Sequence, residues 1–425
     1  MKKLLALLLA VLMLASILVA CGGGGGSTPT PDDNTGSDTS SDDPFYGEDN
    51  ITLLVWAADK AVDLTKTLCD EFVAKYPDKK ITIEVQVQGE GDAAANVLND
   101  ADAAADVFSF ACDQLNRLCR ANALAPLFEP EEVIARNSEA SVNAATVDGT
   151  LYAFPETGDN GYYLVYDKTV VSDEQAETLE GVFEACKAAG KKVVIDAGNG
   201  FFSCMFPFTG GLTLEGITDD VQQFNDYNED EVVDTLVAFA ELFHQYEDIF
   251  MSAEATRISA GMGENPRTVG AGIDGSWNAV AVAEALGDDL GAAKLPTINV
   301  NGTDKQIVSM HGYKLIGVNS HSKFPNAAQL LADFLTDEDA QLARAKELSW
   351  GPSNTNAVKD TSVTSNVALS AIIEQSAYSV PQVAIADTFW TPMGTLGNKL
   401  WKEADYSKDT VKAEFDKAIA NIKDE

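Results

Sequence analysis

From residue 51 onward the chain alternates short apolar segments with segments of helical periodicity. Residues 51–57 and 107–111 are apolar runs, and residues 81–87 alternate apolar and polar side chains as a half-buried strand does. Between them, residues 62–73 repeat apolar side chains at helical spacing, and residues 91–104 are rich in alanine. Strands that alternate with helices predict parallel βαβ units, so we expect an α/β fold.

A second series of the same kind follows. Asp148-Gly149 between apolar segments predicts a hairpin turn. The strand that follows this turn is expected to end at Pro155. Further strands are expected at residues 161–166, 193–196, 269–273 and 311–318, and helices at 112–123, 230–245, 324–336, 338–348 and over most of the chain beyond 358. Ligands of open α/β sheets bind beyond the carboxyl ends of strands, which points to residues 57–60 and 110–114.

The amino terminus predicts the compartment. Lys2 and Lys3 precede an uncharged apolar run over residues 4–20, which is typical of a secretory signal and shorter than the roughly 20 residues of a membrane-spanning helix. The closing Leu-Val-Ala-Cys resembles a bacterial lipoprotein cleavage site and implies lipidation of Cys21. Residues 21–50 are rich in Gly, Ser, Thr, Pro and Asp and are expected to form a flexible tether behind a signal peptide at 1–20.

The charge balance excludes one class of partner. The chain has 66 acidic and 29 basic residues, a formal net charge of -37. Nucleic-acid binding needs a basic surface, so we expect no nucleic-acid partner, and contact with the membrane only through the lipid. Five cysteines remain beside Cys21 without metal-ligand spacing, so no disulfide framework, metal or other cofactor is expected.

Five separated segments share one order along the chain. They are residues 53–60, 106–113, 148–155, 273–277 and 388–390, which read LLVWAADK, DVFSFACD, DGTLYAFP, IDGSW and TFW. In this order they resemble the maltose/maltodextrin-binding members of family 1 of the extracellular solute-binding proteins of ABC transporters. The resemblance differs at Gln114, where the family's maltose binder has an arginine, and at Phe201, where the family has a tyrosine.

The resemblance implies a two-lobe, type II periplasmic-binding-protein-like fold with the ligand in a cleft between lobes. It implies an amino-terminal lobe of residues 51–157 plus 308–354 and a carboxyl-terminal lobe of residues 158–307 plus 355–425. Hinge closure around the ligand would present the protein to the transmembrane subunits of an ABC permease. We expect a monomer without enzymatic activity, anchored on the extracellular face of the membrane of a Gram-positive-type cell.

The residues expected to bind the ligand follow from the same resemblance. A sugar offers apolar C–H faces ringed by hydroxyls, so its site needs aromatic platforms and polar side chains that accept hydrogen bonds. The expected platforms are Phe110, Phe201, Trp277 and Trp390, although a tryptophan can equally be a core residue. The expected polar and backbone contacts are Asp59, Lys60, Asp92, Ala111, Asp113, Gln114 and Asn160, with Asp159 as an alternative to Asn160.

Three other functions remain open on the sequence. An extracellular hydrolase needs a catalytic set, but the chain has three histidines and no His-Glu-x-x-His or Gly-x-Ser-x-Gly motif. A starch-adhering surface lipoprotein would share the anchor and the aromatic platforms but not a hinged two-lobe fold. An importer protein with another oligosaccharide cargo, such as a xylo- or fructo-oligomer, would keep the fold and differ at the cleft. We expect an α-glucan such as maltose or a maltodextrin.

Overall fold

A computed structural model describes residues 43–218 and 221–423 of the chain. The chain divides into a unit of residues 1–43 and a compact unit of residues 44–425. The predicted signal peptide, Cys21 and most of the predicted tether lie outside the described residues. In the described part of the chain, no helix has the length and apolar character needed to cross a membrane.

The first strands of the unit form parallel pairs, as the alternation of strands and helices predicts. Strands β1 (Ile51–Ala57), β2 (Ile81–Val87) and β3 (Val107–Ala111) lie in the order β2-β1-β3 and are joined through α2 (Val62–Lys75) and α3 (Ala93–Asn99). Strand β1 alternates buried and more exposed side chains, so its apolar residues reach the core on one face. The helix expected at 91–104 is shorter than predicted and ends at Asn99.

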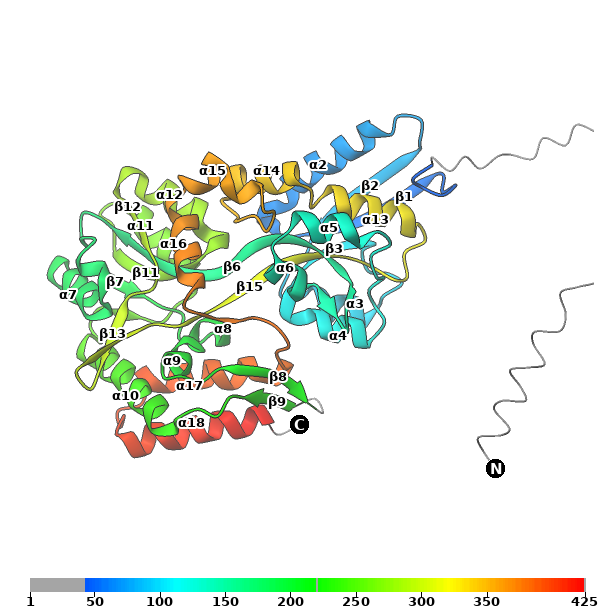
Figure 1. Ribbon diagram of the computed structural model, residues 1–425. Helices are drawn as coiled ribbons and strands as arrows, with labels where there is room; N and C mark the ends of the chain where they lie inside the picture. The colour runs from blue at the N-terminus through cyan, green and yellow to red at the C-terminus, as the bar shows by residue number, and fades with distance from the viewer. Residues whose placement is uncertain (1–42, 219–220, 424–425) are drawn as a thin grey trace, which may run out of the picture. The chain divides into compact units, whose positions relative to one another are not determined.

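Two long strands run from this first sheet region into a second one. Strand β6 (Ala153–Asp167) pairs antiparallel with β15 (Ser309–Val318), and β15 pairs antiparallel with β3 (Figure 1). At its other end β6 pairs with β11 (Val269–Gly275) and β12 (Leu290–Ala293). Strands β7 (Lys192–Val194) and β10 (Phe250–Met251) complete the order β10-β7-β11-β6-β15-β3-β1-β2.

Two large hydrophobic cores lie on either side of these crossing strands. One core draws its buried side chains from residues 45–154 and 315–340, and the other from residues 162–310 and 380–422. Because each core packs its own helices against its own part of the sheet, the unit has two lobes. We call them the first lobe, which contains β1, and the second lobe, which contains β11.

The remaining elements cover the lobes or form small hairpins. The hairpin predicted at Asp148-Gly149 is confirmed, and both residues have positive φ (49° and 79°), as a tight two-residue turn requires. The other elements are α4 (Leu115–Arg120), α5 (Pro130–Arg136), α6 (Glu139–Ala144), β4 (Thr146–Val147), β5 (Thr150–Leu151), α7 (Leu179–Ala189), α8 (Gly200–Ser203), α9 (Met205–Thr209), β8 (Leu214–Thr218), β9 (Val221–Phe224), α10 (Glu229–Gln245), α11 (Thr256–Gly263), α12 (Ala279–Leu286), β13 (Thr297–Val300), β14 (Thr303–Gln306), α13 (Pro325–Phe334), α14 (Glu338–Leu348), α15 (Thr361–Thr364), α16 (Val367–Ser376), β16 (Ser379–Pro381), α17 (Trp390–Lys402) and α18 (Lys408–Lys423).

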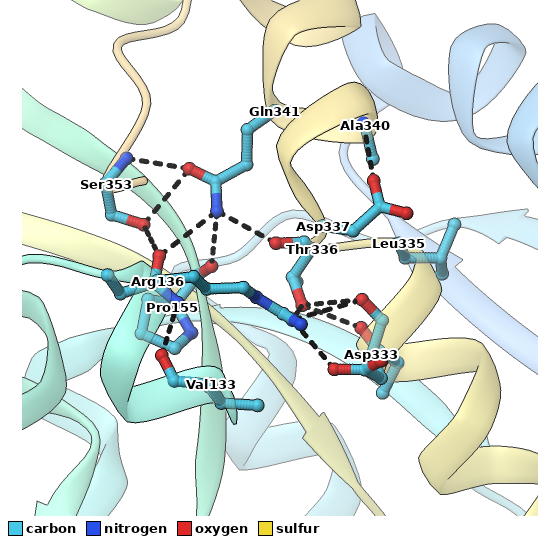
Figure 2. A network of polar contacts seen from close by, with 12 residues as sticks. Val133, Arg136, Pro155, Asp333, Leu335, Thr336, Asp337, Ala340, Gln341 and Ser353 are labelled. Atoms are coloured by element: carbon cyan, nitrogen blue, oxygen red, sulfur yellow. Dashed lines mark hydrogen bonds and ion pairs between the residues drawn. The ribbon is translucent and has the colours of Figure 1, made fainter. Parts of the chain in front are cut away.

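A polar network ties β6 to helix α14 in the first lobe (Figure 2). The buried Gln341 amide donates to the carbonyls of Pro155 (3.3 Å) and Thr336 (2.9 Å). Its oxygen accepts from the backbone N–H groups of Ser353 (2.8 Å) and Asn354 (2.9 Å). One side chain therefore joins β6 to the segment that follows α14, and it satisfies backbone groups that would otherwise be buried without partners.

Candidate functional site

A pocket of about 380 Å³ lies between the two lobes, within the range typical of small-molecule sites. Two other pockets, of about 410 and 440 Å³, are each confined to one lobe. The interlobe pocket alone among these three combines several aromatic rings with charged and amide side chains. Its lining consists of Glu90, Gly91, Ala111, Asp113, Gln114, Asn160, Asn199, Phe201, Phe202, Trp277, Lys314, Gln382 and Trp390.

The second lobe contributes an aromatic wall. Phe201 lies in α8, Trp277 in the 3-10 helix Ser276–Asn278, and Trp390 at the first residue of α17. The ring centroids of Phe201 and Trp277 are 5.8 Å apart, and those of Phe201 and Trp390 are 6.4 Å apart. All three rings are only partly buried, so part of each faces the pocket. Such rings can stack on the apolar faces of a ligand.

The first lobe and the crossing strands contribute polar groups. Asp113 and Gln114 lie in the 3-10 helix Cys112–Gln114, immediately beyond the carboxyl end of β3, and Asn160 lies in β6. The Gln114 amide is used internally, because it donates to the carbonyls of Glu90 and Gly91 (both 2.8 Å) and accepts from the Ala94 N–H (2.9 Å). Gln114 therefore shapes the loop at residues 90–94.

Burial alters the charge of the Asp113 carboxyl. The residue keeps some surface open to the pocket, but protein atoms surround its carboxyl group, and this desolvation raises its pKa to about 7. The Asp387 carboxylate raises this pKa further, while a hydrogen bond from the Gln382 amide (3.0 Å) lowers it. Asp113 therefore changes its ionisation near neutral pH.

A buried cation lies on the first-lobe side of the pocket. Lys314 is 3% exposed, and its Nζ lies 3.6 Å from Glu90 Oε1 and 3.4 Å from the centroid of the Trp350 ring. The carboxylate and the ring face both stabilise the ammonium group. The pocket thus holds opposite charges close together on this side.

Seven residues expected from the sequence meet in the pocket, and four do not. The seven are Ala111, Asp113, Gln114, Asn160, Phe201, Trp277 and Trp390. Phe110 is fully buried beside Phe108 (centroids 5.6 Å apart), because both faces of β3 are covered, so its ring is not open to a ligand.

The other three lie at the surface of the first lobe. Asp59 and Lys60 are exposed in the 3-10 helix Asp59–Ala61, and Asp92 is exposed just before α3. Lys60 nevertheless crosses to the second lobe, where its Nζ donates to Asn278 Oδ1 (3.2 Å) beside Trp277.

Sequence reasoning missed six pocket residues: Glu90, Gly91, Asn199, Phe202, Lys314 and Gln382. Lys314 had one usable signal, because a lysine inside the apolar segment 311–318 must find partners or face a cavity. Phe202 also had a signal, because it adjoins Phe201, which was expected to contact the ligand. Gln382 had no local signal, because only the fold brings it beside Asp113.

The described part of the chain contains no group of three or more His, Cys, Asp or Glu side chains placed to hold a metal ion.

Comparisons with known proteins agree with this architecture. The family model for bacterial extracellular solute-binding proteins matches residues 67–371. The galactooligosaccharide-binding protein of Bacillus subtilis (strain 168) is 25% identical over 329 residues, which are 72% of each chain.

Solved structures show the same fold. A structure described as being with acarbose is 29% identical, has a TM-score of 0.77, and is matched over 88% of this chain and 98% of its own. The maltodextrin-binding protein of L. casei BL23, solved without ligand, is 23% identical with a TM-score of 0.74, over 88% of this chain and 99% of its own. The predicted α/β fold with two lobes and a cleft between them is therefore confirmed, and the chain belongs to the bacterial extracellular solute-binding proteins.

Proposed function

We propose that this protein captures an oligosaccharide in the interlobe pocket and delivers it to an ABC importer. The observation that carries the proposal is the division of the pocket into an aromatic wall from the second lobe and a polar side from the first lobe and the crossing strands. A sugar ring needs both surfaces at once, because its faces are apolar and its edges carry hydroxyl groups.

Each side of the pocket has a separate role in the proposal. Phe201, Trp277 and Trp390 stack on sugar faces, and Asp113 and Asn160 accept hydrogen bonds from hydroxyls. Lys60, Asp59 and Asp92 lie outside the pocket lining and would contact the ligand only after the lobes move closer together. The protein binds its ligand without converting it.

The cargo we favour is an α-glucan such as maltose or a maltodextrin. Several structural neighbours are described as maltodextrin- or maltotriose-binding proteins, which agrees with the sequence segments that led to this expectation. A galacto-oligosaccharide is the second candidate, because the Bacillus subtilis relative is described as binding that class of sugar. The two cargoes differ in linkage geometry and not in the need for aromatic platforms.

The proposal also places the protein at the membrane. Cys21 would carry a lipid, residues 21–50 would form the tether, and a monomeric body would present its closed form to the permease. The lobe boundaries would be those expected from the sequence, with chain crossings near residues 157, 308 and 355.

Isothermal titration calorimetry against a sugar panel tests this function. The panel contains maltose, maltotriose, longer maltodextrins and β-linked galacto-oligosaccharides. We expect saturable binding of α-1,4-glucans. Binding of the β-linked sugars alone would retain the oligosaccharide function and change the cargo, and an absence of binding to every sugar would contradict the proposal.

A further inference from the structure

We propose that Gln382 is a positioning residue of the pocket, which holds Asp113 and Asn160 so that an oxygen atom of each faces the ligand. The inference rests on the proposed function, and it identifies the side chain that orients the polar residues of the pocket. Gln382 follows β16, far in sequence from both residues that it contacts.

The Gln382 side chain bridges the two lining residues with both ends of its amide. Its Nε2 donates to Asp113 Oδ1 at 3.0 Å, and its Oε1 accepts from Asn160 Nδ2 at 2.6 Å. The residue is 4% exposed, so water cannot readily replace either contact. The three side chains form one chain of hydrogen bonds along the pocket.

The direction of this chain follows from the Asp113 carboxylate. An ionised carboxylate only accepts, so the Gln382 amide must turn its NH₂ group toward Asp113 and its oxygen toward Asn160. Asn160 must then turn its own NH₂ group toward Gln382. Asp113 Oδ2 and Asn160 Oδ1 are the side-chain oxygens that the bridge does not use, and we assign them as acceptors for ligand hydroxyls.

The fold holds Gln382 tightly in this position. Its backbone N–H donates to the His311 carbonyl (2.8 Å), and its carbonyl accepts from the Cys112 thiol (2.8 Å). Its side chain lies against Gly312 of β15, where an added Cβ would lie 2.8 Å from the Gln382 Cβ and collide with Oε1. Gly312 pairs directly with Asn160 across the crossing strands, so glycine there leaves the space that the bridge occupies.

One other charged group near Asp113 acts on the same carboxyl. Asp387, in the 3-10 helix Asp387–Phe389, raises the Asp113 pKa and is itself paired with Arg117 (3.1 Å). Glu90 and Lys314 line the same pocket and partly balance each other. Gln382 is the neighbouring side chain that stabilises the charged form of Asp113 by donating a hydrogen bond.

The test uses three variants of the full chain. Gln382→Met keeps the length of the side chain and removes both hydrogen bonds. Gly312→Ala keeps Gln382 and fills the space beside it. Gln329→Met is the control, because Gln329 is similarly buried (7%), donates to the Pro126 carbonyl at 3.0 Å, and lies outside the pocket lining.

Maltotriose affinity is measured by calorimetry for each variant between pH 5 and 9. We expect Gln382→Met and Gly312→Ala to weaken binding by about tenfold at neutral pH and to move the midpoint of the pH dependence upward. Gln329→Met should stay within about twofold of the parent protein. Weaker binding without a shifted midpoint would reduce Gln382 to a packing residue and overturn the inference, as would an unchanged affinity.

A ligand-free measurement separates this inference from the proposed function. If the parent protein binds no sugar, the proposed function fails. Carboxyl NMR then follows the titration of Asp113, identified by its loss in Asp113→Asn. A higher Asp113 pKa in Gln382→Met supports the bridge, and an unchanged pKa overturns it.

Discussion

At the scale of single residues, Trp277 and Trp390 offer separate rings to one side of the pocket. We expect Trp277→Ala and Trp390→Ala each to weaken oligosaccharide binding by about 1–2 kcal/mol, or roughly five- to thirtyfold in Kd, because each removes a stacking surface. Trp277→Phe and Trp390→Phe should retain part of the affinity. Trp401→Ala is the control, because Trp401 packs on Phe250 outside the pocket lining. Equal effects of all three alanine variants in calorimetry would mean that the rings serve only stability.

Asp113 predicts a pH dependence of binding. Its pKa of about 7 means that the carboxyl gains a proton as pH falls below neutrality, and a protonated carboxyl is a weaker acceptor for hydroxyls. Affinity should therefore be nearly constant above pH 8 and fall toward tenfold per pH unit below about pH 6. Asp113→Asn should bind more weakly and lose most of this dependence. A parent protein with constant affinity from pH 5 to 9 would show that Asp113 does not contact the ligand.

At the scale of elements, the crossing strand β6 depends on a buried ion pair. Glu156 in β6 and Arg344 in α14 are 3% and 1% exposed, and their charged groups lie 2.9 Å apart. Arg344→Met leaves the Glu156 charge buried without its partner, so we expect a loss of about 3–5 kcal/mol in the free energy of unfolding, measured with urea. Adding Glu156→Gln should recover part of that loss.

A surface ion pair supplies the control for this prediction. Arg257 and Glu264 are 2.8 Å apart, but their side chains are 35% and 41% exposed, so Arg257→Met should cost no more than about 1 kcal/mol. Similar losses for Arg344→Met and Arg257→Met would contradict the role assigned to the buried pair.

Strand β6 also shows that local sequence signals can give the wrong boundaries for a strand. The sequence predicts one strand that ends at Pro155 and another at residues 161–166, yet β6 is continuous from Ala153 to Asp167. The neighbouring strand β15 supplies its pairing, with irregular register near Lys314, and Gln341 binds the Pro155 carbonyl. These partners come from distant parts of the chain, so tertiary contacts override the local pattern.

At the scale of the whole molecule, two polar contacts between the lobes each involve at least one exposed side chain. Lys60 donates to Asn278, and Arg117 pairs with Asp387, whose side chain is 68% exposed. Such contacts are individually weak, so a ligand that touches both lobes should control closure. Small-angle scattering should show a smaller radius of gyration for the body from residue 44 onward when its oligosaccharide is added. An unchanged radius with saturated ligand would contradict a hinged mechanism.

The sequence predicted the fold class and much of the aromatic wall, because those signals are local. Periodicity alone predicted strands β1, β2 and β3 and helix α2, and Trp277 and Trp390 each stand in a short segment that resembles the family. The polar side could be predicted only in part, because its geometry depends on contacts between distant segments. Gln382 reaches Asp113 and Asn160 only after β16 has paired with β15.

A crystal structure of the protein with maltotriose, or with whichever oligosaccharide binds most tightly in the panel, tests the central claim most directly. We expect the sugar in the interlobe pocket, with rings stacked on Trp277 and Trp390 and hydroxyls within hydrogen-bonding distance of Asp113. An oligosaccharide bound elsewhere on the protein, with the interlobe pocket empty, would contradict the account.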